Sequence, residues 1–231
     1  RFFGPASRLH HKRPPTGWTR FEGDIRPRAY NLLKTPGPQD SPWQAARILG
    51  NAAAEIRMWH TSGRMDHLAR NADGDDVLFV HEGSGHFFCD YGHLEFRDGD
   101  YILIPRGTAW RVECAGEARI LMIQATNDAF GLPNKGPVGT HAIFDPAMLD
   151  VPAIDEAFLD QQDETEWAIE IKRAGKIGRQ IFPFNPLDAI GWHGDLSVVR
   201  INWRDIRPLM SARYHVPPSA HTTWLAGRVV V

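Results

Sequence analysis

The chain has 231 residues, which is enough for one large domain or two modest ones with a proper core. Its 26 basic and 28 acidic residues leave a formal net charge of −2, so charge gives no reason to expect binding to nucleic acid or to an anionic membrane. A small-molecule partner is therefore expected.

No targeting signal is recognisable in the N-terminal segment. Residues RFFGPASRLHHKR lack the apolar core of a signal peptide, and no apolar run approaches the roughly 18 residues that cross a bilayer. We expect a soluble protein, with His10 and His11 solvated in their basic surroundings. Residues 10–30 are rich in Pro, Gly and Trp, which argues against a helix and predicts strands and loops that wrap a larger body.

Residues 76–126 carry the clearest pattern, and they lie within an N-terminal β region that we assign to residues 1–130. Runs of β-branched and aromatic residues recur there at short, even spacing, separated by Gly or Asp-Gly. This pattern predicts an antiparallel sandwich or barrel and an all-β fold. Cys89 and Cys114 are expected to be buried free thiols, which favours a reducing cytoplasm over a disulfide-linked secreted fold.

Residues 131–165 indicate a loop-rich connection, in which PAIDEAFLDQQ predicts a short helix or a turn. The alternation typical of strands resumes at residue 166. There Trp167 and Ile169 fall on one face, and Lys172 is among the polar residues expected on the solvent side. Residues 166–231 are predicted to form strands that lead into a second, truncated barrel.

The stretch GDYILIPRGTAW fits the second half of the cupin signature, which runs Gly, five residues, Pro, one residue, Gly, two residues, His. Gly99, Pro105 and Gly107 keep their places, and Trp110 stands where the histidine is required. The glycines permit the turn conformations, and Pro-x-Gly makes a tight corner between strands. The alternative is a sandwich in which this spacing is accidental.

The first half of the signature places two histidines before an acid, with a glycine seven residues after the acid. Asp76 and Gly83 have that spacing, but the histidine positions fall within residues 69–72, which contain no histidine, and His67 is out of register. An iron or zinc site needs three or four converging ligands. The sequence therefore predicts a metal-free cupin barrel.

Five segments in collinear order resemble the homogentisate 1,2-dioxygenases in their compact bacterial-type form: RNADGDDVLFVHEGSG, LIPRGTAWRVE, GPVGTHAIFDP, FPFNPLDAIGWHGD and YHVPPSAHTT. The resemblance extends from about His10 to Thr223, and its most specific parts are Asn71 to Asp75 and Pro183 to Gly194. It implies a two-barrel cupin protein, or bicupin, whose first barrel holds no metal. It also implies homotrimers that pair into homohexamers.

The resemblance implies that Fe(II) is bound in the second barrel by two His and one Glu, with open positions for an aromatic acid and dioxygen. Those ligands are expected beyond Val231. In YHVPPS, His215 matches the family histidine that acts as general base and hydrogen-bonds the phenol hydroxyl of the substrate, so it is our candidate catalytic and substrate-binding residue. The alternative is an ordinary turn histidine before two prolines.

Other histidines are weaker candidates. His193, in GWHGD, is expected to be buried and hydrogen-bonded in a structural role. His60 and His67 have no partner at ligand spacing. His141 lies where longer family members carry asparagine, which leaves a substrate contact open.

The resemblance favours ring cleavage of homogentisate to maleylacetoacetate. One alternative is a metal-free binding module that holds a small aromatic or carbohydrate between Trp110 and its neighbours. A related dioxygenase for another hydroxylated aromatic acid is a third possibility. The chain begins with Arg1 and stops in the apolar run RVVV, so we expect a clipped chain rather than a natural remnant.

Overall fold

The computed structural model describes residues 7, 9–34, 37–132, 144–207 and 222–231. It divides into two units, Arg1–Lys34 and Thr35–Val231. In the described part of the first unit, the one regular element is a 3-10 helix at Leu32–Lys34, and nearly all side chains are exposed, including His10 and His11. The strands expected in residues 10–30 are therefore wrong, because this segment offers no alternating apolar face that a sheet could bury.

The second unit is mainly β, which confirms the expected all-β fold. Its large sheet has eleven strands, and a small sheet has two. The strands of the large sheet are β1 (Ala46–Gly50), β2 (Ala54–Arg64), β3 (Leu68–Asn71), β4 (Gly74–Glu82), β5 (Gly85–Cys89), β6 (Gly92–Phe96), β7 (Asp100–Ile104), β8 (Ala109–Thr126), β9 (Trp167–Arg173), β10 (Lys176–Phe182) and β11 (Val199–Asn202).

The small sheet pairs β12 (Leu225–Ala226) with β13 (Val229–Val230). The one described α-helix, α1, spans Glu156–Asp160, and short 3-10 helices occur at Pro42–Gln44, Pro146–Met148 and Trp203–Asp205. Helix α1 begins where the Asp155 side chain accepts a hydrogen bond from the backbone N–H of Phe158.

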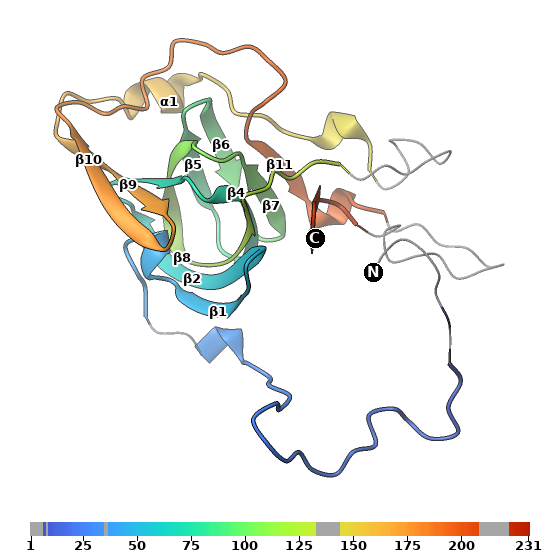
Figure 1. Ribbon diagram of the computed structural model, residues 1–231. Coiled ribbons are helices and arrows are strands. Elements are labelled where there is room, and N and C mark those ends of the chain that lie inside the picture. The colour runs from blue at the N-terminus through green and yellow to red at the C-terminus, as the bar shows by residue number, and fades with distance from the viewer. Residues whose placement is uncertain (1–6, 8, 35–36, 133–143, 208–221) are drawn as a thin grey trace. The chain divides into compact units, whose positions relative to one another are not determined.

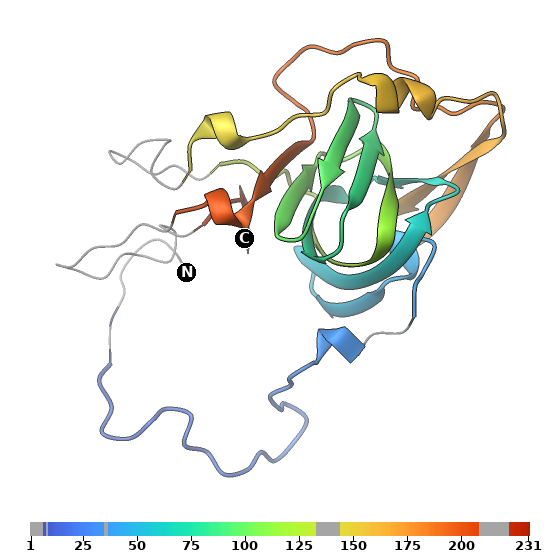
Figure 2. The same cartoon turned by 180° about the vertical axis from the view of Figure 1, so that it is seen from behind.

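Strand β8 closes the barrel. Along one side of its 18 residues lies β2, followed by β3, and along the other side lie β4 and then β5. Because one long strand is shared by four partners, the sheet curls on itself, as Figures 1 and 2 show from opposite sides. The interior is therefore lined by alternate residues of each strand.

Apolar side chains fill that interior. The cluster includes Trp59, Ala69, Leu78, Val80, Phe87, Cys89, Ile102, Ile104, Trp110, Val112, Ile120 and Met122. Both cysteines are free, with Cys89 buried and Cys114 half-buried. Burial raises the pKa of both thiols, to about 11 for Cys114, so neither is a ready nucleophile.

The later strands join the same sheet. Strand β9 runs parallel to β3 and carries β10 at the sheet edge, while β11 pairs with β7. Residues 167–202 thus extend the sheet of the first barrel, and the second barrel expected in residues 166–231 stays a prediction. Trp167 and Ile169 are buried as expected, but Lys172 is buried as well, with 2% of its surface exposed.

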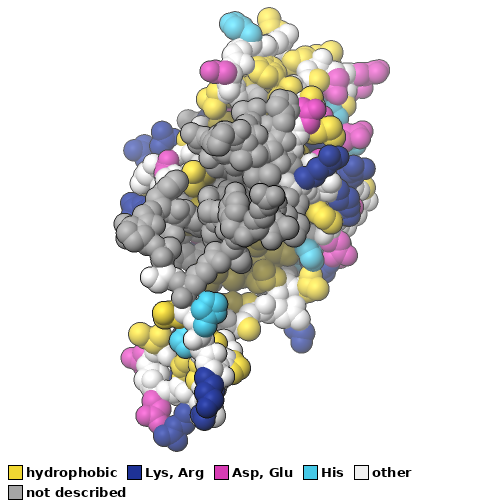
Figure 3. All heavy atoms as spheres, turned by 90° about the vertical axis from the view of Figure 1, so that its right-hand side faces the viewer, with side chains coloured by type: hydrophobic (Ala, Val, Ile, Leu, Met, Phe, Trp, Pro, Cys, Tyr) yellow, Lys and Arg dark blue, Asp and Glu magenta, His cyan; other side chains and the backbone are white. Residues whose placement is uncertain are grey.

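In the described residues, no helix is long and apolar enough to span a membrane. Figure 3 shows Lys and Arg side chains interspersed with Asp and Glu on the face that it draws, in keeping with the formal net charge of −2.

Candidate functional site

The corner that the sequence predicts between β7 and β8 is present. Gly99 and Gly107 have φ of 85° and 89°, in the left-handed region that favours glycine. The backbone N–H of Thr108 donates to the carbonyl oxygen of Pro105 at 3.2 Å and closes the turn. Trp110 follows as the second residue of β8.

Trp110 fills the place that a metal ligand would occupy. Its side chain is 0% exposed, stacks on Phe87 with ring centroids 5.6 Å apart, and meets Trp59 edge-on at 6.0 Å. Ala69 lies directly opposite it on β3, so a small residue leaves room for the indole. Because these rings pack against one another, a ligand held between Trp110 and its neighbours does not fit.

The neighbouring residues do not form the metal site of the cupin signature. The expected histidine positions hold Ala69 and Asn71, and Asp76 is the acid of the motif. His67 instead lies 2.8 Å from Asp66 through Nδ1. Among the described residues, no three His, Cys, Asp or Glu side chains are grouped to hold a metal ion.

A layer of buried and half-buried polar side chains lies at one end of this barrel. We call it the polar layer, and its members are Glu55, Asn71, Asp73, Asp76, Gln124 and Lys172. Five of the six stand within three residues of a strand end, and Asp73 lies between β3 and β4. Hydrogen bonds and ion pairs link the six side chains.

Asp76 is the most deeply buried acid of the polar layer. Asn71 Nδ2 donates to Asp76 Oδ2 at 2.9 Å and to Gln124 Oε1 at 2.9 Å. Burial raises the pKa of Asp76 to about 7, although the Asn71 bond and the charge of Lys172 act in the opposite direction. This carboxyl group therefore exchanges its proton near neutral pH.

Lys172 supplies the cation of the polar layer. Its Nζ lies 3.2 Å from Asp73 Oδ2 and 3.9 Å from Glu55 Oε2, and it also donates to Gln124 Oε1. The expected solvent-side position was wrong because β9 pairs with β3 so that Lys172 stands beside Asn71. No local signal in the sequence indicated this, because Lys172 and Asp73 lie 99 residues apart in the chain.

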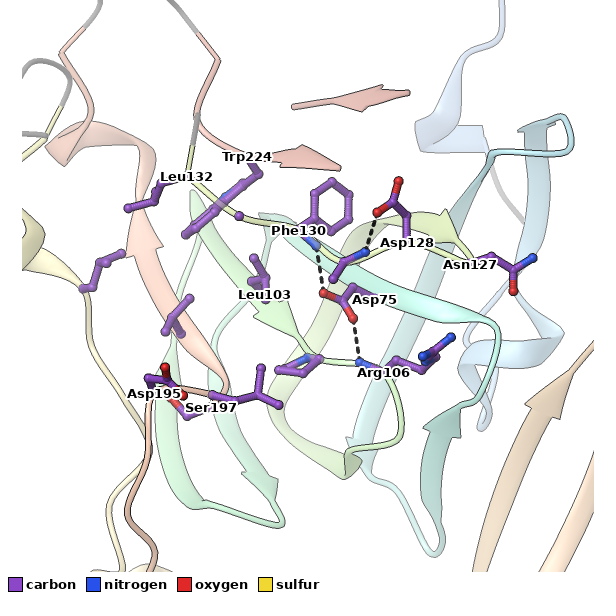
Figure 4. A pocket seen from close by; sticks show the side chains of 16 residues that line it. Asp75, Leu103, Arg106, Asn127, Asp128, Phe130, Leu132, Asp195, Ser197 and Trp224 are labelled. Atoms are coloured by element: carbon purple, nitrogen blue, oxygen red, sulfur yellow. Dashed lines mark hydrogen bonds between the residues drawn. The ribbon is translucent and has the colours of Figure 1, made fainter. Parts of the chain in front are cut away.

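Asp75 links the corner between β7 and β8 to the segment that follows β8. Its Oδ1 accepts from the backbone N–H of Arg106 at 2.7 Å, and its Oδ2 accepts from that of Phe130 at 2.8 Å, as Figure 4 shows. Burial raises its pKa above the usual value despite these bonds. Gly74 is needed for space, since a Cβ there would lie 1.8 Å from the Ala125 carbonyl oxygen.

Asp75 also faces a cleft, drawn in Figure 4, whose other walls include Leu103, Leu132 and Trp224. Trp224 is 2% exposed, and its buried indole N–H has no hydrogen-bond partner among the described residues. The cleft is mostly apolar, with Asp75 as its buried acid. Arg106, Asp128 and Asp195 also line it, and among the described residues no three acids or histidines are grouped to hold a metal ion.

The structure describes only some of the histidines named from the sequence. His215 and His141 are outside the described residues. His193 is exposed, so the expected buried role was wrong, because its turn lies on the surface with neighbours that are themselves exposed or half-buried.

One buried histidine was missed by the sequence analysis. His93 is bonded through Nδ1 to Asp155 at 2.8 Å and through Nε2 to His86 Nδ1 at 2.9 Å. Since Asp155 also caps α1, this chain of bonds ties the helix to the β5–β6 hairpin. No local signal in the sequence indicated the bond to Asp155, because Asp155 lies 62 residues from His93 in the chain.

Solved structures with a similar fold include cupin proteins. A cupin-2 domain protein from Shewanella frigidimarina is 19% identical and covers 40% of this chain and 85% of its own, with a TM-score of 0.34. The Cnp3 cupin domain of Schizosaccharomyces pombe is 12% identical and covers 43% and 74%, with a TM-score of 0.38.

Comparison with protein families gives a more specific result. The model described as homogentisate 1,2-dioxygenase N-terminal matches residues 44–201. The homogentisate 1,2-dioxygenase of Rhodopseudomonas palustris BisA53 is 29% identical over 168 residues, which are 72% of this chain and 37% of that relative. That of Nitrobacter hamburgensis is 29% identical over 164 residues, 70% and 36% of the two chains. The chain thus spans little more than a third of these relatives' length, and it belongs to the homogentisate 1,2-dioxygenase family.

Proposed function

We propose that this chain is part of an iron-dependent dioxygenase that opens the ring of homogentisate and yields maleylacetoacetate. The observation that carries the proposal is the match of residues 44–201 to the N-terminal model of that family. The filled interior of the barrel supports a scaffold role for this part of the enzyme. Trp110 and Ala69 occupy positions where cupin metal sites have ligands, and they pack instead.

The proposal assigns iron binding to residues outside this barrel, with two His and one Glu expected beyond Val231. His215 is proposed as the general base that takes the proton of the substrate's ring hydroxyl, a role that imidazole suits near neutral pH. The small aromatic acid and dioxygen would both bind in the iron site. Homotrimers or homohexamers in the cytoplasm are part of the same proposal.

The test is an oxygen-uptake assay on the whole protein, with iron determined on the same sample. We expect iron and homogentisate-dependent uptake, with maleylacetoacetate as the product. His215→Gln is expected to lower kcat by roughly 100-fold or more at unchanged iron content. His193→Gln is the matched control, because His193 is exposed, and it should leave kcat unchanged.

Two results would count against the proposal. A folded whole protein without iron and without uptake would remove the dioxygenase assignment. Uptake with another hydroxylated aromatic acid, but not with homogentisate, would show a related dioxygenase of different specificity.

A further inference from the structure

We propose that the cavity at the polar end of the barrel is a binding site for a small carboxylate anion, held by Arg47, Arg106 and Arg173. The inference goes beyond the proposed function and does not depend on it.

The cavity has a volume of about 660 Å³, within the range of small-molecule sites. Its walls come from six parts of the barrel: β1 and the turn after it, the start of β2, the β3–β4 turn, the corner between β7 and β8, the end of β8 and the β9–β10 turn. Figure 4 shows that the side chains of Arg106 and Asn127 lie on the side of Asp75 away from Leu103 and Trp224. Both residues line the apolar cleft as well as this cavity, so they stand between the two.

The charge balance of the cavity is positive. Two acids, Glu55 and Asp73, line it beside the three arginines. Each acid is already paired with a cation that does not line the cavity: Glu55 with Arg57, and Asp73 with Lys172.

The arginines have no such partners. Within the described part of the chain, no ion pair or side-chain hydrogen bond engages Arg47, Arg106 or Arg173, and all three are exposed. Arg106 uses its backbone N–H to hold Asp75, and its charge acts on that acid only from a distance. Three guanidinium groups are thus left for a ligand.

The position of Arg47 is built into β1. A bulge interrupts the pairing of β1 with β2 between Arg47 and Leu49. At Gly50, a Cβ would lie 2.2 Å from Arg47 Nη2, so the absence of a side chain there makes room for the guanidinium.

The rim is held in an unfavourable backbone conformation. Among the described residues, the two non-glycine residues with positive φ are Asn127, at 56°, and Ala174, at 49°, and both line the cavity. Asp73 secures them: its carbonyl oxygen accepts from Asn127 N at 2.6 Å, and its Oδ1 accepts from Ala174 N at 2.6 Å. Strained backbone conformations of this kind are concentrated at ligand-binding sites, where they pre-organise the binding groups.

Guanidinium groups bind planar carboxylates through two parallel hydrogen bonds, which favours a carboxylate over a spherical anion. Asn51 adds a donor. Its Oδ1 already accepts from the backbone N–H groups of Ala53 and Ala54, at 2.7 and 2.9 Å, which leaves its NH₂ group for the cavity. The volume suits a small dicarboxylate.

The experiment is calorimetric titration of the whole protein with succinate and, separately, with inorganic phosphate. We expect saturable succinate binding, with phosphate weaker. Arg47→Gln and Arg173→Gln should each weaken succinate by about tenfold or more, and the double variant by more than either. Arg97→Gln is the control, because Arg97 is exposed, outside the cavity and without a described ion pair.

Four outcomes would overturn the proposal. The first is the absence of succinate binding at millimolar concentration. The second is equal weakening by Arg97→Gln, which would show a general charge effect. The third is phosphate binding as tight as succinate binding, which would contradict recognition of a carboxylate. The fourth is succinate binding that Arg47→Gln does not weaken, which would show that succinate binds at another site.

Discussion

At the scale of single residues, the carboxyl group of Asp76 is buried away from water. Burial raises its pKa to about 7 from the ordinary 3.8, against the effects of Asn71 and Lys172. The folded protein therefore keeps this proton while the unfolded chain loses it as the pH rises between those two values. The free energy of unfolding falls over that interval and stays lower above it.

Asp76→Asn keeps the shape of the side chain and removes its titration. We expect its free energy of unfolding to match that of the wild type near pH 4 and to exceed it, by on the order of 2 kcal/mol, near pH 8. Urea unfolding across this pH range measures the difference. Asp195→Asn, at an exposed acid, is the control and should follow the wild-type curve. If the free energy of unfolding of Asp76→Asn changed with pH in parallel with that of the wild type, the raised pKa of Asp76 would be contradicted.

At the scale of elements, Arg111 of β8 joins three parts of the fold. It is 0% exposed, and its guanidinium lies 4.4 Å from the ring centroid of Phe88 on β5 and 5.3 Å from that of Trp167 on β9. It also donates to Gln161, just after α1, at 3.2 Å, and pairs with Glu113. Burial lowers its pKa, so the stacked rings and polar partners together hold this cation.

Arg111→Met preserves the aliphatic length but loses these contacts, so we expect a loss of roughly 2 to 3 kcal/mol in stability. Hydrogen exchange should rise first in residues 156–182, while β2 stays protected. Arg119→Met is a control on the same strand, because Arg119 pairs with the exposed Glu82 and should cost no more than about 1 kcal/mol. A uniform rise in exchange would show that Arg111 does not anchor these elements.

The strands of residues 76–126 were predictable because alternation and turn residues are local signals. The corner at Gly99 to Gly107 was predictable for the same reason. The burial of Lys172 was not, since it depends on pairing with β3, about 100 residues earlier in the chain. The cavity arginines were also missed, because Arg47, Arg106 and Arg173 come together only when the barrel closes.

At the scale of the whole molecule, the barrel is held by packing and by its polar layer. The apolar interior surrounds Trp110, and Asp73, Asp75 and Asp76 bond the strand ends around it. Each feature of the cupin signature that remains therefore has a structural use. It follows that the stability of this barrel should not depend on iron.

Trp110→His tests that conclusion, because it restores the imidazole of the signature without the other ligands. We expect a loss of roughly 3 kcal/mol in stability, since a smaller polar ring replaces an indole packed between Phe87 and Trp59. Iron per chain should not rise, because Ala69 and Asn71 offer no partner ligands. Urea unfolding and metal analysis of the whole protein measure the two quantities. Trp110→Phe, which keeps an aromatic ring, should lose less stability at the same iron content, and extra iron bound by Trp110→His alone would show that ligands do converge there.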